Sequence, residues 1–565
     1  MPKENYLALK NGSDVRGIFM ENREVLPVTL TEEAVANIAK AFCVWLISHT
    51  GKVNVTIAVG YDSRISSPAF SEAIVRAVTS IGHSAVSTDL STTPSMLALL
   101  KDATWQEEYP CEGSIMITAS HLPSYYNGMK FFFKGSGLAS KDIEEILTLA
   151  TSYRFTETQK KGSNIHAPYL DRYAANLVAF IQKSTGEALP LLNQKIIVDA
   201  GNGVGGFYAT KVLLPLGADI LGSQFLEPDG TFPNHIPNPE NEGAILSLRN
   251  AVKENHADFG IIFDTDVDRA GAVDQDGNEL NRNRLIALIS AVLLEEKSGT
   301  IVTDSVTSDG LTKFIESRGG RHHRYMRGYK NVIDEATRLN KAGEYTPLAI
   351  ETSGHAALLE NGFQDDGAYL ITRLLIAYAK AAKQGKKLTD LIADLESPKE
   401  TLEFRIPILE KEDIKHLGRR VIDAYYDYTV HTPYVVPAKN VYEGARANYD
   451  EKHGNGWALI RQSLHEPLLP INVESASQHG GMKIAKDIYY FLKQFPFLDL
   501  TPLEKAIEKN RQRLIKQIQT DFYTDVNYLS FIFGKKVVLL SNEPEPDNEP
   551  PVLATLLPEK TDNNA

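Results

Sequence analysis

Three acidic residues that alternate along the chain are the first candidates for chemistry. The segment FDTDVDR follows the apolar run Ile261–Phe263 and contains Asp264, Asp266 and Asp268, followed by Arg269. Carboxylates this close raise one another's pKa unless a cation lies among them. A divalent ion with oxygen ligands removes the repulsion, and Mg²⁺ is favoured where a phosphate oxygen completes the site. An exposed acidic turn is the alternative. A Ca²⁺ loop would need a glycine where Arg269 stands.

A serine at the end of a predicted strand is the second candidate. The strand predicted over 114–117 breaks into the turn TASHLP, which contains Ser120 and His121, and Lys130 follows ten residues after the serine. The chain has no GxSxG segment, so the sequence does not predict a serine nucleophile on a nucleophile elbow. Facing a metal site, Ser120 could instead carry a phosphoryl group, with Lys130 or His121 handling protons. An ordinary turn residue is the alternative.

Two later segments offer groups that bind sugars and phosphates. The first, AIETSGHAAL, alternates a carboxylate, a hydroxyl and an imidazole, which can hold vicinal sugar hydroxyls. The second, RQSLHEP, combines a guanidinium fork with a neutral donor and a nearby imidazole, as a phosphate cradle would. The side chains concerned are Glu351, Ser353 and His355 in the first segment and Arg461, Ser463 and His465 in the second. Either set alone could also belong to an ordinary loop that binds no ligand.

A glycine-rich segment supports a competing function. In DAGNGVGG, Gly201, Gly203 and Gly206 match the dinucleotide pattern after a predicted strand, and Glu227 lies beyond the next apolar run. An NAD-linked oxidoreductase is therefore an alternative. However, Glu227 begins a loop rich in Pro and Asn that is unsuited to a simple ribose contact. Tight packing between a strand and a helix also explains the glycines.

Composition excludes several classes of protein. The chain has 565 residues, of which 43% are hydrophobic and 23% charged, as in ordinary globular proteins with several domains. Its net charge of −13 argues against non-specific nucleic-acid binding. No apolar run approaches the roughly 20 residues of a membrane helix. The N-terminus MPKENYLALK resembles neither a signal nor a transit peptide, and we expect a cytoplasmic protein.

The elements that must position these groups repeat one pattern. The segments Val55–Arg64, Lys195–Gly206 and Thr300–Gly310 each place a β-branched run before a Gly/Asp/Ser turn and an amphipathic stretch. This alternation predicts βαβ units and three α/β domains with mainly parallel sheets. After about Leu402 the strands shorten, which predicts a fourth domain of α+β type. A charged helix is predicted from Thr501, followed by a disordered acidic tail.

Taken together and in order, these motifs resemble the α-D-phosphohexomutase superfamily, and within it the phosphoglucomutase/phosphomannomutase group. That family shows a TASHNP-like phosphoserine loop, a DxDxDR metal loop, an ExSGH sugar loop and an RxSxTxP-like phosphate loop. Smaller segments are similar too: GSDVRGIF with Arg16, GYDSRISSP with Arg64, STTPSM, PDGTFPNHIPNPEN and FQDDGAYLITRLL. The resemblance covers roughly residues 8–490.

The resemblance implies a fold of four domains around a central cleft, three of them similar and mixed α/β and the last α+β and TBP-like. We expect the boundaries to divide the chain as follows: 1–187 phosphoserine domain, 188–297 metal-binding domain, 298–402 sugar-binding domain, 403–500 phosphate-binding domain, and 501–565 helical extension with the tail.

The resemblance also implies residue roles. Ser120 would be the phosphoserine and would join the three aspartates around Mg²⁺, and Lys130 would be the first choice for acid/base work. The remaining catalytic groups would be Arg16, His121 and Arg269. The substrate-binding groups would be Glu351, Ser353, His355, Gly328, Lys330, Arg461, Ser463 and His465.

The implied activity is an isomerase that interconverts hexose 1-phosphate and hexose 6-phosphate of glucose or mannose through a hexose 1,6-bisphosphate. Catalytic amounts of that bisphosphate would be needed as activator. We expect small hexose phosphates as partners, no nucleic acid or membrane, and a monomer or weak homo-oligomer. A phosphoglucosamine mutase and a non-catalytic sugar-phosphate-binding relative remain alternatives. Departures from the family pattern stand at Leu122, at Tyr329–Lys330 in an expected sugar-selecting turn, and at Leu464–His465.

Overall fold

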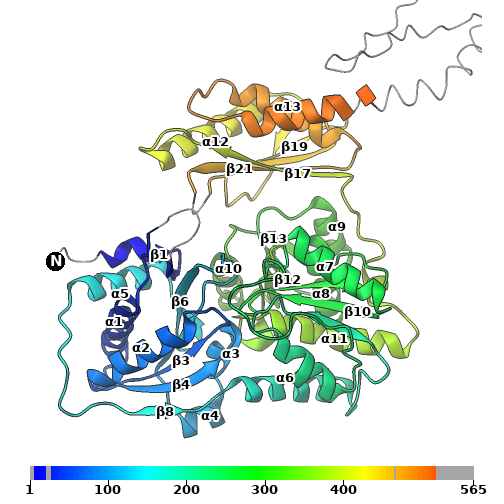
Figure 1. The fold of residues 1–565 in the computed structure, drawn as a ribbon. Coiled ribbons are helices and arrows are strands. Elements are labelled where there is room, and N and C mark those ends of the chain that lie inside the picture. Colours follow the sequence, from blue (N-terminus) through cyan, green and yellow to red (C-terminus); the bar gives the residue numbers. More distant parts are fainter. Residues whose placement is uncertain (1–4, 21–26, 464–465, 514, 517–565) are drawn as a thin grey trace, which may run out of the picture.

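A computed structural model describes residues 5–20, 27–463, 466–513 and 515–516 of the chain. Four sheets follow one another along the sequence (Figure 1). Residues 501–513 form the beginning of the predicted helical extension. The predicted acidic tail and His465 lie outside the described residues. Within the described part, no helix is both long enough and apolar enough to cross a membrane.

The first domain is built on an eight-stranded mixed sheet. Its central path runs β1-β2-β6-β5-β3-β4-β8, with β7 paired to β6. Its strands are β1 (Lys10–Asn11), β2 (Asp14–Ile18), β3 (Thr56–Tyr61), β4 (Ser84–Leu90), β5 (Gly113–Ile117), β6 (Tyr126–Phe133), β7 (Ser136–Gly137) and β8 (Asn164–His166). Its helices are η1 (Tyr6–Leu9), α1 (Glu32–Thr50), α2 (Ser67–Ser80), α3 (Thr93–Ala98), α4 (Ala103–Glu108) and α5 (Ser140–Ser152). The next helix, α6 (Leu170–Thr185), packs mainly on elements of the two following domains.

The second domain has a three-stranded sheet. Strand β10 lies in its middle, parallel to β9 and antiparallel to β11. The strands are β9 (Ile196–Asp199), β10 (Phe259–Phe263) and β11 (Ala270–Asp274), and the helices are η2 (Tyr208–Leu213), η3 (Leu214–Leu216) and α7 (Glu242–Glu254). Helix α8 (Asn283–Glu296) follows β11 and packs on helices of the third domain. All five residues of β10 are buried, as its apolar sequence requires.

The third domain has a five-stranded mixed sheet in the order β13-β12-β14-β15-β16. Its strands are β12 (Thr300–Thr303), β13 (Arg321–Arg324), β14 (Leu348–Ile350), β15 (Ala356–Leu358) and β16 (Gln364–Asp365). Its helices are α9 (Asp309–Ser317), α10 (Tyr329–Lys341), η4 (Leu359–Asn361), α11 (Gly367–Lys383) and η5 (Leu388–Ile392).

The fourth domain has a five-stranded antiparallel sheet in the order β17-β21-β20-β19-β18. The strands are β17 (Glu400–Pro407), β18 (Val435–Pro437), β19 (Ala445–Tyr449), β20 (Gly456–Ile460) and β21 (Leu468–Ser475). Helices α12 (Ile414–His431) and α13 (Gly480–Leu492) pack on this sheet. The predicted fold class, three mixed α/β domains followed by an α+β domain, is confirmed.

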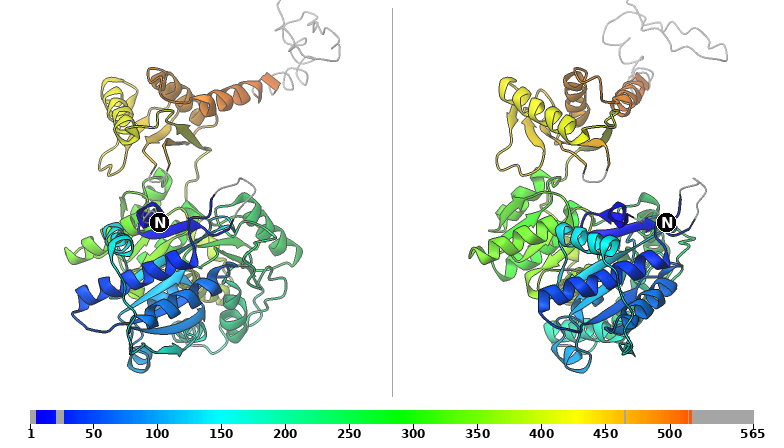
Figure 2. Two further views of the ribbon diagram at one scale, coloured as in Figure 1. Left: turned by 60° about the vertical axis from the view of Figure 1, so that its left-hand side comes forward. Right: turned by 90° about the vertical axis from the view of Figure 1, so that its left-hand side faces the viewer.

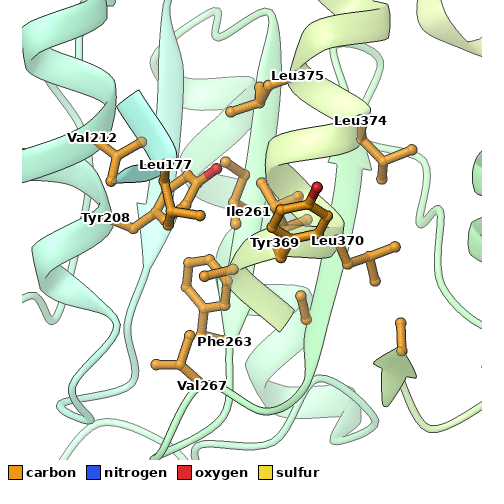
Figure 3. Packing of buried hydrophobic residues seen from close by; sticks show 14 of the residues in the cluster. Leu177, Tyr208, Val212, Ile261, Phe263, Val267, Tyr369, Leu370, Leu374 and Leu375 are labelled. Carbon is orange, nitrogen blue, oxygen red and sulfur yellow. The ribbon is translucent and has the colours of Figure 1, made fainter. Parts of the chain in front are cut away.

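One large hydrophobic cluster links the first three domains, and each of them also has a smaller cluster of its own. A single cluster of buried side chains extends from Ala58 in the first domain to Ile392 in the third. Figure 3 shows part of it, where Leu177 of α6 and Phe263 of β10 pack close to Leu370 of α11. Burial of such side chains is the main favourable term in folding, so this core fixes the three domains relative to one another.

The fourth domain has its own core, built from residues 404–503. It lies to one side of the other three domains in every view (Figures 1 and 2). A single stretch of chain before β17 leads into it from the third domain.

Candidate active site

The loop that carries Ser120 is held through its backbone. The loop joins β5 to β6, and Ser120 adopts a left-handed conformation with φ of 52°, which is unusual for a residue other than glycine. The Arg64 side chain is fully buried and its guanidinium donates to four carbonyl oxygens of the loop. The acceptors are Ser120 at 2.5 Å, Leu122 at 2.6 Å, Pro123 at 2.8 Å and Tyr126 at 2.8 Å.

Ser120 meets the acidic loop across the boundary between the first and second domains. Its hydroxyl oxygen lies 3.1 Å from Oδ2 of Asp264 and 3.3 Å from Nδ1 of His121. The serine is only 6% exposed. Residues 144 positions apart in the sequence therefore form one site, as the sequence predicted for a serine facing the acidic triplet.

The three aspartates converge in the loop between β10 and β11. Val267 takes a left-handed φ of 66°, so the chain turns within the DxDxD segment instead of continuing as a strand. One carboxylate oxygen from each of Asp264, Asp266 and Asp268 lies within 4.8 Å of the other two, and all three side chains are fully buried. The alternative of an exposed acidic turn is therefore wrong.

Burial and charge repulsion both act on the carboxyl groups of this cluster. Burial, together with the charges of Asp268 and Asp266, raises the pKa of Asp264 well above its usual range. Burial opposes ionisation of Asp268 too, but the charges of Lys130, His355 and Arg269 together outweigh it and lower the pKa of Asp268. The Oδ1 atoms of Asp266 and Asp268 are buried and accept no hydrogen bond from the described residues. Unpartnered buried carboxylate oxygens are costly, and a hard cation with oxygen ligands would satisfy them.

Lys130 supplies one positive charge to the site. It projects from β6, is 4% exposed, and its ammonium contacts Oδ2 of Asp268 and lies 3.3 Å from Oδ2 of Asp266. Burial alone would lower the pKa of Lys130, but the charges of Asp266, Asp268 and Asp14 raise it well above its usual value. The side chain is thus held as a cation.

Arg269 and His355 continue the network into the third domain. The Arg269 Nε–H group donates to Nε2 of His355 at 2.8 Å, and His355 donates from Nδ1 to Asp365 at 2.6 Å. Nδ1 also lies 3.9 Å from Asp268. Because both ring nitrogens are engaged in this way, the hydrogen bonds orient the imidazole of His355. His121 is neutral, since the charge of Arg269 and burial lower its pKa well below the usual value.

Arg16 lies beside the serine loop. Its guanidinium donates to Asp14 at 2.8 Å and to the carbonyl oxygen of Thr118, two residues before Ser120. The structure therefore places all five predicted catalytic residues in or next to one buried cluster that also contains the three aspartates.

Two supporting residues were not predicted as site residues. Thr93, from STTPSM, donates its hydroxyl to Oδ2 of Asp266 at 2.5 Å and its backbone N–H to the carbonyl oxygen of Asp266 at 2.9 Å. Asp365, from FQDDG, orients His355. Both segments stood out in the sequence, but no local signal indicated which distant residue they would contact.

The predicted sugar loop follows β14. Glu351 is 4% exposed and accepts a hydrogen bond from the backbone N–H of Gly328 at 2.7 Å. The hydroxyl of Ser353 is buried and has no hydrogen-bond partner among the described residues, which leaves it available to a ligand. Lys330, by contrast, pairs with Asp334 one turn further along α10.

The predicted phosphate cradle lies at the end of β20. Arg461 is 6% exposed, its Nε is buried without a partner among the described residues, and its Nη1 lies 3.6 Å from Glu443. Ser463 accepts a hydrogen bond from the backbone N–H of Glu466 at 3.2 Å. Glu443, which no motif indicated, also accepts from the Ser305 hydroxyl at 2.6 Å, so the cradle touches the third domain. No direct contact joins Arg461 to Ser120 among the described residues.

The glycine-rich segment supports the acidic loop. A Cβ atom on Gly203 would lie 2.7 Å from the carbonyl oxygen of Thr265, and one on Gly206 would lie 2.1 Å from that of Leu226. The backbone N–H of Val204 donates to Thr265 at 2.9 Å. Gly203 thus allows close packing against the loop that carries the aspartates, and Gly206 allows it against Leu226, which accounts for the pattern without a dinucleotide.

This combination of three α/β domains, a separate antiparallel domain and a serine facing an acidic triplet defines an α-D-phosphohexomutase. Models of phosphoglucomutase/phosphomannomutase alpha/beta/alpha domains I, II and III match residues 8–157, 167–277 and 281–398. The chain is 30% identical over 493 residues to a phosphoglucomutase of Neisseria gonorrhoeae, covering 86% of this chain and 96% of the relative. It is 29% identical over 436 residues to a phosphomannomutase/phosphoglucomutase of Pseudomonas putida, covering 77% and 86%.

The fold agrees with a solved structure. A phosphoglucomutase/phosphomannomutase family protein from Burkholderia thailandensis superimposes with a TM-score of 0.68 at 24% identity, over 86% of this chain and 97% of that one. The chain belongs to the phosphoglucomutase/phosphomannomutase family. The predicted resemblance is therefore confirmed.

Proposed function

We propose that this chain is a hexose phosphate mutase that interconverts the 1-phosphate and 6-phosphate of glucose or mannose. The names of its relatives support the general activity. The observation that carries the detailed proposal is the hydroxyl of Ser120, 3.1 Å from Asp264 and within the acidic cluster. We assign Ser120 as the residue that carries the transferred phosphoryl group, with a hexose 1,6-bisphosphate as the intermediate.

The acidic loop fits a magnesium ion. Asp264, Asp266 and Asp268 offer carboxylate oxygens only, two of them buried without a partner among the described residues. Hard oxygen ligands of this kind suit Mg²⁺. We assign these three residues as its ligands, with an oxygen of the phosphoryl group on Ser120. When bound, Mg²⁺ supplies positive charge that offsets the negative charge of the phosphoryl oxygens.

The protein's own groups divide the remaining work. Transfer breaks the bond between phosphorus and the Ser120 oxygen and forms a bond from phosphorus to a sugar hydroxyl oxygen. His121 is neutral and lies 3.3 Å from the Ser120 oxygen. We therefore assign it to accept the proton of the attacking sugar hydroxyl and to donate a proton to the departing Ser120 oxygen. Lys130, the first choice from the sequence for acid/base work, is instead assigned as a fixed cation, because its raised pKa keeps it protonated.

Substrate binding draws on the third and fourth domains. Glu351 and the unpartnered hydroxyl of Ser353 are assigned to sugar hydroxyls, with His355 close by. Arg461 and Ser463 are assigned to the phosphate that is not being transferred, and the buried free Nε–H of Arg461 supports this role. Gly328 forms the turn beside Glu351. Lys330 remains assigned as a substrate contact, and its ion pair with Asp334 must break before the ammonium can bind substrate. His465, which lies outside the described residues, remains proposed as a substrate-binding residue.

Conversion of glucose 1-phosphate to glucose 6-phosphate tests the proposal. The assay contains Mg²⁺ and a trace of glucose 1,6-bisphosphate, and compares the wild-type protein with Ser120→Ala and with Ser124→Ala from the same loop. We expect Ser120→Ala to lose activity by more than about 1,000-fold, because removal of a nucleophile abolishes the covalent route. Ser124→Ala should behave as wild type. Equal activity of Ser120→Ala and wild type would refute the assignment.

Intact-mass measurement separates a working mutase from a binding protein. The wild-type protein incubated with the bisphosphate should gain the mass of one phosphoryl group, mapped to Ser120, and Ser120→Ala should not. A protein that binds hexose phosphates but is never phosphorylated would be the non-catalytic relative. Parallel assays with mannose 1-phosphate and glucosamine 1-phosphate decide the preferred sugar.

A further inference from the structure

Tyr329 stands where the sequence suggested a sugar-selecting turn, but its side chain faces the first domain. It is the first residue of α10 and follows Gly328, whose φ of 109° is a conformation that residues with a side chain rarely adopt. The Gly328 backbone N–H is held by Glu351 at 2.7 Å. The turn is therefore fixed from the third domain, and the tyrosine extends away from it.

The tyrosine hydroxyl contacts the loop between β1 and β2. It lies 3.0 Å from the hydroxyl of Ser13 and 3.5 Å from Oδ1 of Asp14. Asp14 in turn accepts from Arg16 at 2.8 Å. One side chain of the third domain thus reaches a segment more than 300 positions earlier in the chain.

The tyrosine ring contacts two site residues. It stacks on the imidazole of His355 with ring centres 5.2 Å apart and an interplanar angle of 25°. The ammonium of Lys130 lies 5.7 Å from the ring centre. Aromatic rings attract cations at such distances, and the attraction is stronger where water is excluded. Lys130 therefore has carboxylates on one side and an aromatic ring near it as well.

We propose that Tyr329 is a positioning residue that acts through Lys130, holding the ammonium in place and joining the first and third domains over it. The inference rests on the proposed function, in which Lys130 is a fixed cation beside the transferred group. A lysine has a flexible four-carbon stem, so without further support its ammonium could move relative to Asp266. Stacking on His355, itself bonded to Arg269 and Asp365, makes the ring a rigid support.

The test compares two substitutions at one position. Tyr329→Leu removes the ring and the hydroxyl, and we expect kcat to fall about 10- to 100-fold with KM for glucose 1-phosphate within about 3-fold, because misplacement of a catalytic group affects the transition state. Tyr329→Phe keeps the ring and should lower kcat by less than about 3-fold. The ratio of kcat/KM for glucose 1-phosphate and mannose 1-phosphate should stay unchanged in both.

A matched control exists in the same domain. The ring of Tyr345 lies 3.9 Å from the ammonium of Lys297, and neither residue belongs to the site. Tyr345→Leu should leave kcat and KM as in wild type, even if thermal stability falls. A Tyr329→Leu variant that only loses stability, or that raises KM with kcat unchanged, would overturn the proposal. A changed sugar preference would also overturn it, because Tyr329 would then select the substrate.

A double-mutant cycle tests the domain link without any activity. The free energy of unfolding is measured for Ser13→Ala, Tyr329→Phe and the double variant, and we expect the double variant to lose less than the sum of the single variants. Additive losses would show that Ser13 and Tyr329 do not interact, and would refute the link between the two domains. Because both substitutions are mild, this test can be carried out even if Tyr329→Leu does not fold. A wild-type protein without mutase activity would instead refute the proposed function, whatever the cycle gives.

Discussion

The two parts of this molecule are held together in different ways. A hydrophobic cluster connects the first three domains, and Ser120, the aspartates and Lys130 are buried where the first two of these domains meet. The fourth domain has a separate core and meets the third through polar contacts and through Tyr442, whose ring packs on those of Tyr325 and His323. Arg446 donates to the carbonyl oxygens of Ser305 at 3.0 Å and Thr307 at 3.2 Å, and its partner Asp309 lies at 2.9 Å.

This difference in packing assigns the chemical step to the first three domains and phosphate recognition to the fourth. Apolar packing is dense and tolerates little displacement, so it suits groups that must stay within fractions of an ångström. Polar contacts can be exchanged for contacts with water or ligand at small net cost. We therefore infer that the three-domain body fixes the reacting groups, whereas the fourth domain presents a phosphate-binding arginine that can adjust to either end of the sugar.

The largest effect is expected from the three-domain body. Asp266→Asn removes one of the three carboxylates, and we expect kcat to fall about 100-fold or more and Mg²⁺ binding to weaken. Calorimetry with Mg²⁺ alone measures the second effect without substrate. Asp274→Asn is the control, since Asp274 is also buried, on β11, but accepts from the backbone N–H groups of Asp276 and Asn278. Unchanged Mg²⁺ affinity in Asp266→Asn would contradict the metal assignment.

A different signature is expected from the fourth domain. Arg461→Gln removes a charged donor to phosphate, and we expect KM for glucose 1-phosphate to rise about 10- to 100-fold with kcat changed by less than about 3-fold. Steady-state kinetics measure both. Arg419→Gln, which affects an exposed arginine paired with Asp423 on α12, should leave both constants unchanged. A fall in kcat alone would mean that the fourth domain takes part in the chemical step, and the comparison would fail.

The stability of the fourth domain should also depend on pH. Glu474 of β21 is 5% exposed and accepts from the indole N–H of Trp457 at 2.8 Å, and burial raises its pKa from 4.5 to about 7. A raised folded-state pKa means that its stabilising contribution is complete below pH 4.5 and is lost as the pH rises through 7. Glu474→Gln should therefore raise the free energy of unfolding at pH 8 by roughly 1–3 kcal/mol.

Urea unfolding at pH 4.5 and pH 8 measures this change. The advantage of Glu474→Gln should be absent at the lower pH. Glu403→Gln, at an exposed position on the neighbouring strand β17, should show no such pH-dependent gain. If Glu474→Gln gives no advantage at pH 8, the carboxyl of Glu474 does not limit the stability of this domain.

The smallest effect is expected from a departure within the serine loop. Leu122→Asn introduces the residue that the family pattern favours. We expect kcat to change by less than about 3-fold, because Arg64 binds the backbone carbonyl of Leu122 and not its side chain. Arg64→Lys is the contrasting variant: it keeps the charge but loses the guanidinium fork, and it should lower kcat by at least about 10-fold. A large gain in Leu122→Asn would show that a polar side chain is needed there.

Much of the site could be predicted because its groups follow strand ends. The apolar runs before Ser120 and Asp264 are short and β-branched or aromatic, so they form central strands, and the chemistry-bearing residues come directly after them. A third such run precedes Glu351. The order of the motifs along the chain then indicated the family and the fourth domain.

The rest depends on contacts between distant segments. Nothing near Tyr329 indicates that its hydroxyl reaches Ser13, and nothing near Thr93 indicates Asp266. Glu443 pairs with Arg461 only because β19 and β20 are neighbours in the folded sheet. Such pairings are set by the packing of whole domains, which local periodicity does not specify.

The grip of Arg64 on four carbonyl oxygens has an evolutionary consequence. Arg64 also pairs with Asp62, but its hydrogen bonds to the serine loop all go to main-chain oxygens, so they do not depend on the side chains of that loop. Substitutions around Ser120, such as the leucine at 122, can therefore accumulate without rebuilding the turn. During evolution, side chains around Ser120 could therefore change one at a time while the Ser120 hydroxyl keeps its position facing the acidic triplet.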